Sequence, residues 1–194
     1  MVGECGTKRA VTVRRPRPPL NAEKLNELAL TYVARFATTR AKLARYLIGK
    51  VRERGWQGSR EPDIAEIVER CARLGFVDDA AFALSKARSL TGRGYGSGRV
   101  RQSLRAAGVA DQDAQAATEL AERNAVEAAL RLASRKRIGP YSAAPMERDE
   151  REKALSAMVR GGHSFGLAKA IIALEPGAEP DLLSLSEAAG RIID

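Results

Sequence analysis

Apolar residues recur at helical spacing along most of the chain. The first stripe has apolar positions three or four residues apart, as on one face of an α-helix, at Leu25, Leu28, Ala29, Tyr32, Val33 and Phe36. Similar stripes run through 43–51, 64–74, 126–133 and 167–174. No segment alternates β-branched and polar residues, and no hairpin turn signal is present. The pattern therefore predicts an all-α fold.

One helical block occurs three times. In each copy the middle helix has two apolar residues four positions apart and is followed by a glycine. The apolar pairs are Leu43 and Leu47, Val100 and Leu104, and Ala154 and Met158. An apolar helix precedes and follows each block, so we interpret the chain as three tandem three-helix repeats of roughly 50 residues. Units that bury their faces against neighbours predict an elongated, curved array.

The repeats set the expected domain limits. We expect repeat one at residues 21–75, repeat two at 76–121 and repeat three at 122–176. Residues 1–20 combine several Lys and Arg with three prolines, which predicts a disordered basic tail. Residues 177–194 are expected to form a C-terminal tail, with at most a weak terminal helix.

The stretch from Leu74 to Val109 has the strongest local signals. A glycine ends one helix, two aspartates can cap the next, and an alternating glycine segment at 92–98 breaks that helix before a third one ends at another glycine. The residues expected to have structural roles here are Gly75, Asp78, Asp79, Phe82, Gly94, Gly96, Leu104 and Gly108.

Charge points to a polyanionic partner or an acidic protein surface. The formal net charge is +9, and the windows 28–52 and 80–110 contain no acidic residue. Arg101 and Arg105 share a helix face on which no acidic partner is expected. The candidate binding residues are Arg40, Lys42, Arg45, Arg93, Tyr95, Arg99, Arg101 and Arg105. The alternatives are a solvated helix face for the cations and packing into the repeat core for Tyr95.

The sequence contains no residue pattern that supports catalysis or metal binding. The glycines at 92–98 lack the preceding strand and the lysine–hydroxyl pair of a phosphate loop, so we expect them to allow positive φ and a tight turn. Asp78 and Asp79 have no further ligands nearby, and His163 has no neighbouring nucleophile. We expect no enzyme activity, no metal and no cofactor. Two distant cysteines, no membrane-length apolar run and no secretory signal predict a cytoplasmic protein.

Two blocks of the sequence resemble the RecX family of bacterial regulators of the recombinase RecA. The first block is Leu74–Ala83, and the second runs from Arg93-Gly94-Tyr95-Gly96 through Arg99–Leu104 to Gly108-Val109. The resemblance extends more loosely over most of residues 25–174. It departs from the family at an insertion around residues 57–61 and at a proline-rich loop, 139–145, where we expect altered local geometry.

The resemblance implies a modular helical protein that lies in the groove of the RecA filament on single-stranded DNA. Such a protein limits filament extension and dampens strand exchange and ATP hydrolysis. The expected partners are therefore the RecA filament and single-stranded DNA, with no membrane, and we expect a monomer. The alternative from the residues is a stand-alone DNA-binding protein with helix-turn-helix character, which would bind duplex DNA with a steep salt dependence.

Overall fold

A computed structural model of the chain describes residues 18–190. That range contains ten α-helices and one short 3-10 helix, and its only extended pairing is an isolated bridge between Leu20 and Trp56. The predicted all-α fold is confirmed. The basic tail predicted for residues 1–20 lies, up to residue 17, outside the described residues, whereas Leu20 is fully buried.

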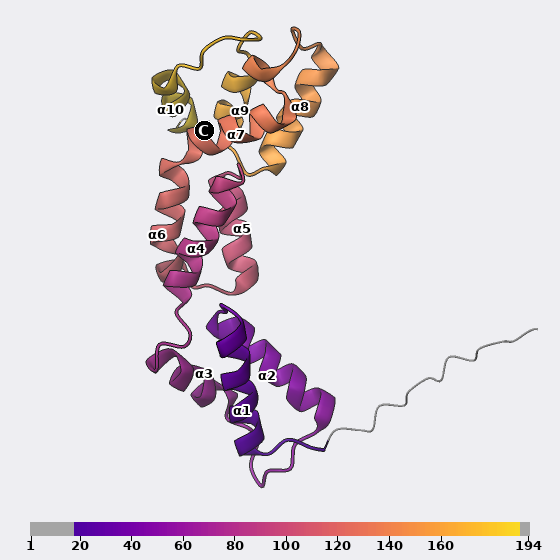
Figure 1. Ribbon diagram of the computed structural model, residues 1–194, viewed down its shortest axis with the longest axis vertical. Coiled ribbons are helices and arrows are strands. Elements are labelled where there is room, and N and C mark those ends of the chain that lie inside the picture. Colours follow the sequence, from indigo (N-terminus) through magenta and orange to yellow (C-terminus); the bar gives the residue numbers. More distant parts are fainter. Residues whose placement is uncertain (1–17, 191–194) are drawn as a thin grey trace, which may run out of the picture.

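Within the described range, helices α1 to α9 group in threes (Figure 1). The first group is α1 (Ala22–Arg35), α2 (Arg40–Arg54) and α3 (Ile64–Arg73). The second is α4 (Asp79–Gly92), α5 (Ser97–Ala107) and α6 (Asp111–Arg123). The third is α7 (Ala125–Lys136), α8 (Arg148–Arg160) and α9 (Phe165–Ile172), with the 3-10 turn Gly139–Tyr141 after α7. The groups follow one another in an elongated, bent array, as the repeat pattern predicts.

Each group buries its own apolar core. The apolar pairs that define the repeat, such as Leu43 and Leu47 or Val100 and Leu104, are buried in their respective cores. The second core is rich in alanine, including Ala83, Ala87 and Ala117, and these small side chains let α4 pack along α6. Each repeat is therefore a small three-helix unit with its own core, and it gains further stability by packing against the adjacent repeats.

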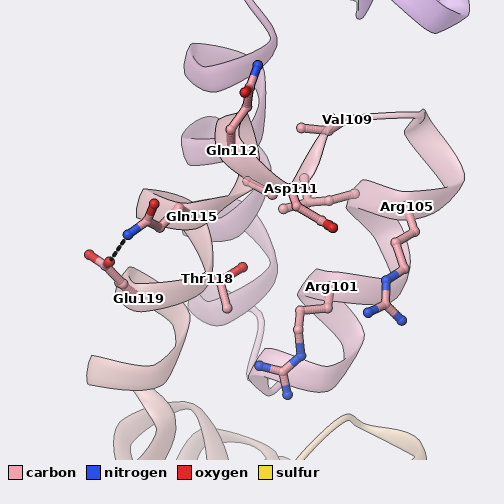
Figure 2. A pocket seen from close by; sticks show the side chains of 10 residues that line it. Arg101, Arg105, Val109, Asp111, Gln112, Gln115, Thr118 and Glu119 are labelled. Atoms are coloured by element: carbon pink, nitrogen blue, oxygen red, sulfur yellow. Dashed lines mark hydrogen bonds between the residues drawn. The ribbon is translucent and has the colours of Figure 1, made fainter.

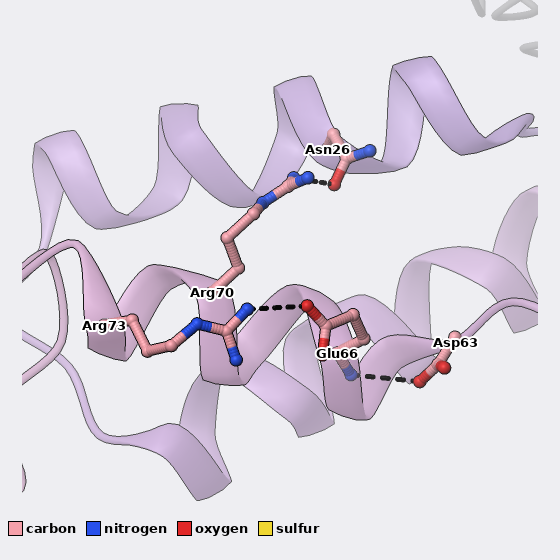
Figure 3. Close-up of polar contacts among 5 residues, drawn as sticks. All are labelled: Asn26, Asp63, Glu66, Arg70 and Arg73. Atoms are coloured by element: carbon pink, nitrogen blue, oxygen red, sulfur yellow. Dashed lines mark hydrogen bonds and ion pairs between the residues drawn. The ribbon is translucent and has the colours of Figure 1, made fainter.

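The first repeat also has polar contacts within α3 and from α3 to α1 (Figure 3). Asp63 caps α3 by accepting the backbone N–H of Glu66 at 2.9 Å. Glu66 pairs with Arg73 at 2.7 Å, and Arg70 donates to the amide oxygen of Asn26 on α1 at 2.5 Å. Of these contacts, the Arg70–Asn26 hydrogen bond joins α3 to α1, whereas the cap and the ion pair lie within α3 at the surface, where an ion pair contributes little by itself.

The segment after residue 176, expected to be a tail, contains a further helix. Helix α10 (Leu182–Gly190) packs against α7 and α9. Leu185 is buried and joins the third apolar core. Burial of this single leucine explains why the segment docks on the third repeat.

The joint between repeats one and two is the place where the end of α5 meets the start of α2. The Thr39 hydroxyl caps α2 and donates to the backbone oxygen of Ala107 at 2.7 Å. Gly108, at φ 74°, ends α5 so close to α2 that an added Cβ would lie 2.4 Å from the Cβ of Ala41. The two aspartates at the start of α4 have different roles. Asp78 caps α4, as predicted. Asp79 instead contributes to the first joint: it is 4% exposed and accepts the N–H of Arg40 at 2.9 Å.

The joint between repeats two and three has the same geometry, with the end of α8 against the start of α5. The N–H groups of Gly96 and Gly98 donate to the backbone oxygens of Gly161 and Gly162 at 2.9 and 3.0 Å. A Cβ on Gly96 would lie 2.3 Å from the Gly162 oxygen. Both joints thus pair free N–H or hydroxyl groups at one helix start with free carbonyls at another helix end, and the helix dipoles align head to tail.

The alternating glycines at 92–98 have a different role from the one predicted. Only Gly94, at φ 82°, has the positive φ that we expected for this segment. Gly92 ends α4 in helical geometry, whereas Gly96 and Gly98 serve close backbone contact with the third repeat. The glycines are therefore needed mainly for the approach of two repeats, and only at one position for the turn.

His163 lies buried at the second joint, with 6% of its surface exposed. Its Nε2 lies 3.1 Å from the Gly94 carbonyl oxygen and must donate to it, whereas Nδ1 has no hydrogen-bond partner in the described structure. Burial lowers the pKa of His163 below the ordinary value of 6.5, against the smaller opposing effect of the Gly94 hydrogen bond.

We predict that Gly96→Ala destabilises the protein by about 1–3 kcal/mol, because the methyl group overlaps the Gly162 carbonyl and must separate the two repeats. Gly92→Ala is the matched control, since nothing lies within 4 Å of a Cβ there, and it should be neutral or slightly stabilising. Urea unfolding of both variants measures the difference. Equal stability of the two variants would contradict the proposed close contact.

A second prediction concerns the pH dependence of stability. Since the unfolded chain protonates His163 at a higher pH than the folded chain, the free energy of unfolding should decrease as pH falls through 6.5 and level off below the folded-state pKa. His163→Gln should lack this contribution. The stability difference between wild type and variant, measured by urea unfolding across this pH range, should therefore shift in favour of the variant in acid. A pH-independent difference is the contrary result.

Candidate functional site

The eight candidate binding residues do not form one surface in the folded chain. Lys42 and Arg45 lie at the first joint, whereas Arg93, Tyr95 and Arg99 lie near the second. Arg101 and Arg105 line a groove between α5 and α6. The structure therefore separates the candidates into groups with different electrostatic surroundings.

The first joint brings several cations close together. Lys42 of α2 contacts Phe82 of α4, and the charges of Lys86 on α4 and Arg45 on α2 act on it; we name these four residues the junction surface. The Lys42 ammonium lies 4.5 Å from the centre of the Phe82 ring, a cation–π contact. Arg45 donates to the carbonyl oxygens of Ala106 and Ala107 at 3.2 and 3.5 Å, at the negative end of the α5 dipole.

The electrostatics of the junction surface are those of crowded like charges. Burial lowers the pKa of Lys42, and the charges of Lys86 and Arg45 lower it further. Among residues 18–190, no ion pair to a carboxylate involves Lys42, Arg45 or Lys86. Lys86 and Arg45 thus repel Lys42, and the lack of an ion pair to a carboxylate favours an external anion at this position.

The groove between α5 and α6 contradicts the expectation for Arg101. Arg101 pairs with Glu122 at 2.9 Å, because α6 packs beside α5 and presents its carboxylate there. Arg105 lines the same groove, a hollow of about 440 Å³ whose walls also include Asp111 and Glu119 (Figure 2). The groove has both signs of charge and is therefore a weaker anion site than the junction surface.

The remaining candidates are partly engaged inside the protein. Tyr95 is half-buried and packs against the second core, which is the alternative to a binding role given above. The Arg93 guanidinium lies 5.4 Å from the Tyr95 ring centre. Arg99 donates to the side chain of Gln102 at 2.7 Å, and Arg40 pairs with Glu69 at 3.5 Å. Since Arg45 also donates to carbonyl oxygens of α5, these contacts leave Lys42 as the candidate best placed to meet an external anion.

Aromatic residues of the first repeat form a feature that the sequence analysis missed. Tyr32 and Tyr46 stack with ring centres 4.2 Å apart at 18°, and Phe36 lies 5.3 Å from Tyr32. We name these three residues the aromatic row. Phe36, expected on the buried stripe, is 55% exposed, because it follows the last residue of α1 and has left the helical register.

Lys86 and Phe82 were also not among the predicted binding residues. Phe82 was assigned a structural role, and Lys86 lies on the same face of α4 one turn later. Their relevance depends on α4 packing near the start of α2, which sequence periodicity does not reveal. For Tyr46, a usable signal was its position between Lys42, Arg45 and Lys50 on a basic helix.

The site therefore offers electrostatic and stacking contacts. No group of three or more potential metal ligands occurs within residues 18–190. Over the same residues, no helix is long and apolar enough to cross a membrane.

Fold and site together define a tandem three-helix repeat protein with a cationic surface at a repeat joint. A family model described as RecX, second three-helix domain, matches residues 78–117. The chain is 34% identical to Regulatory protein RecX of Myxococcus xanthus (strain DK1622) over 174 residues, 84% of this chain and 91% of the relative. It is 32% identical to Regulatory protein RecX of Agrobacterium fabrum over 108 residues, 56% of this chain and 58% of that relative.

Solved structures agree with this assignment at the level of fold. The crystal structure of RecX from Lactobacillus salivarius superimposes with a TM-score of 0.57 at 23% identity, covering 78% of this chain and 94% of that one. The extent of the Myxococcus match is the stronger observation. The chain belongs to the RecX family of regulatory proteins.

We predict that Lys86→Gln raises the pKa of the Lys42 ammonium, because it removes one of the two neighbouring charges that lower it. Burial of Lys42 remains, so the pKa should not return fully to its ordinary value of 10.5. NMR titration of the Lys42 side chain in both proteins measures the shift. An unchanged Lys42 titration would show that the two ammonium groups do not interact.

Proposed function

We propose that this chain regulates the RecA recombinase by binding the RecA filament on single-stranded DNA, with the junction surface facing the DNA phosphates. The observation that supports this orientation is the gathering of Lys42, Arg45 and Lys86 without an internal carboxylate partner. Bound phosphates would relieve the repulsion among the three cations and release counterions from the DNA. Such a regulator acts in the cytoplasm, in recombination and DNA repair.

The shape of the molecule supports a role along a filament groove. The array is elongated, and its repeats are connected by joints with hydrogen bonds and close packing rather than by free linkers. A body of this kind can contact several neighbouring positions of a filament at once. Occupying the groove would hinder filament extension, strand exchange and the ATP hydrolysis that accompanies filament activity.

The test is inhibition of the single-stranded-DNA-dependent ATPase of RecA from the same organism. We predict that Lys42→Gln with Lys86→Gln raises the half-inhibitory concentration by about tenfold, equivalent to about 1.4 kcal/mol of binding free energy. Arg45 is left intact because its hydrogen bonds to α5 contribute to the joint. Each phosphate contact that is lost should also reduce the salt slope of binding by about 0.7.

The matched control is Arg131→Gln with Arg148→Gln. It changes the net charge equally but removes only exposed ion pairs within the third repeat. This control should inhibit as the wild type does. Equal inhibition by the junction variant would contradict the proposed orientation, whereas no inhibition by the wild type, combined with tight binding to naked duplex DNA, would favour a stand-alone DNA-binding protein.

A further inference from the structure

The aromatic row and the junction surface share one face of α2. Lys42, Tyr46 and Lys50 are spaced four residues apart, so they lie along one stripe of the helix. Lys42 contacts Phe82 at one end of the stripe. Towards the other end, Tyr46 stacks on Tyr32, and the Lys50 ammonium lies 5.9 Å from the Tyr46 ring centre. Cations and aromatic rings therefore alternate along a continuous track that leads away from the first joint.

The rings of this track are unusually accessible for a core-facing stripe. Tyr32 and Tyr46 are half-buried, and Phe36 at the end of the row is 55% exposed. Single exposed aromatic residues are common on protein surfaces. Here, however, Tyr32 contacts both Tyr46 and Phe36, and Tyr46 lies one turn from Lys42 of the junction surface. The cations are suited to phosphates, and the rings are suited to flat apolar groups attached to them.

We infer that the aromatic row is a stacking site for unpaired nucleobases, with Phe36 as its principal platform. This inference rests on the proposed function, since it extends the DNA contact from the phosphates to the bases. Duplex DNA keeps its bases stacked inside the helix, so the row selects single strands. Stacking on an aromatic ring tolerates any base, so the site is expected to show little sequence preference. The Lys50 ammonium is paired with Glu53, which leaves Lys42 and Lys86 as the phosphate contacts.

The decisive experiment is a cycle of changes in the protein and the DNA, with no recombinase present. The full chain and its Phe36→Leu variant are titrated at low ionic strength with a short oligothymidylate and with the same strand carrying abasic sites. Wild type should bind the abasic strand about tenfold more weakly. Phe36→Leu should bind oligothymidylate about tenfold more weakly than wild type and should no longer distinguish the two strands.

Phe76→Leu is the matched control. Phe76 lies in the same repeat and is 51% exposed, but it is located in the turn between α3 and α4 and makes no described contact with the aromatic row. It should bind both strands as wild type does. The salt slope should be unchanged in Phe36→Leu and smaller in Lys42→Gln, because only the lysine contacts a phosphate.

Three results would overturn the inference. They are undetectable binding of oligothymidylate by wild type, an abasic penalty that persists in Phe36→Leu, and an equal loss of affinity in Phe76→Leu. A variant that binds the oligonucleotide normally but inhibits RecA poorly would instead identify the row as a protein contact. Because the binding cycle contains no RecA, failure of filament regulation and failure of base stacking are distinguished.

Discussion

The contact on which the rest of the structure depends is the joint at which one helix ends against the start of another. At both joints a middle helix of one repeat receives hydrogen bonds from the start of the corresponding helix in the preceding repeat. Glycines permit this approach, since a side chain at Gly96 or Gly108 would overlap its neighbour. Without these contacts the repeats would be three small cores connected by short loops. With them, α2, α5 and α8 follow one another along one side of the array (Figure 1).

The first joint also determines where charge accumulates. By placing the start of α2 near α4, it brings Lys42 within reach of Phe82 and Lys86. The resulting repulsion lowers folding stability slightly and favours an anionic partner, a combination typical of binding surfaces rather than of cores. The second joint has Arg93 and Arg99 nearby, whereas its Gly96, Gly98 and His163 are used in contacts between the repeats. The two joints thus have similar backbone geometry but different charged and aromatic surroundings.

Much of the fold could be predicted from local pattern, because helical periodicity and capping depend on residues a few positions apart. The burial of Val100 and the cap at Asp78 are examples. The predictions were wrong where a segment distant in the sequence determines a residue's contacts. Glu122 reaches Arg101 from another helix, and Gly96 meets the third repeat, neither of which has a local signal. Phe36 fits the apolar stripe by spacing, but the helix ends before it. Apart from Tyr95, the site residues were predicted from charge, and they therefore included cations that are engaged internally.

The central claim is that the face of α2 and α4 around the first joint meets DNA within the RecA filament. A photoreactive benzophenone side chain at Ser89, one turn beyond Lys86 on the exposed face of α4, tests it directly. In filaments assembled on single-stranded DNA, irradiation should crosslink this position to the DNA strand. The same group at the exposed Ala116 on α6 should give little DNA crosslinking. Crosslinks from Ala116 but not from Ser89, or crosslinks from Ser89 to RecA alone, would contradict the account.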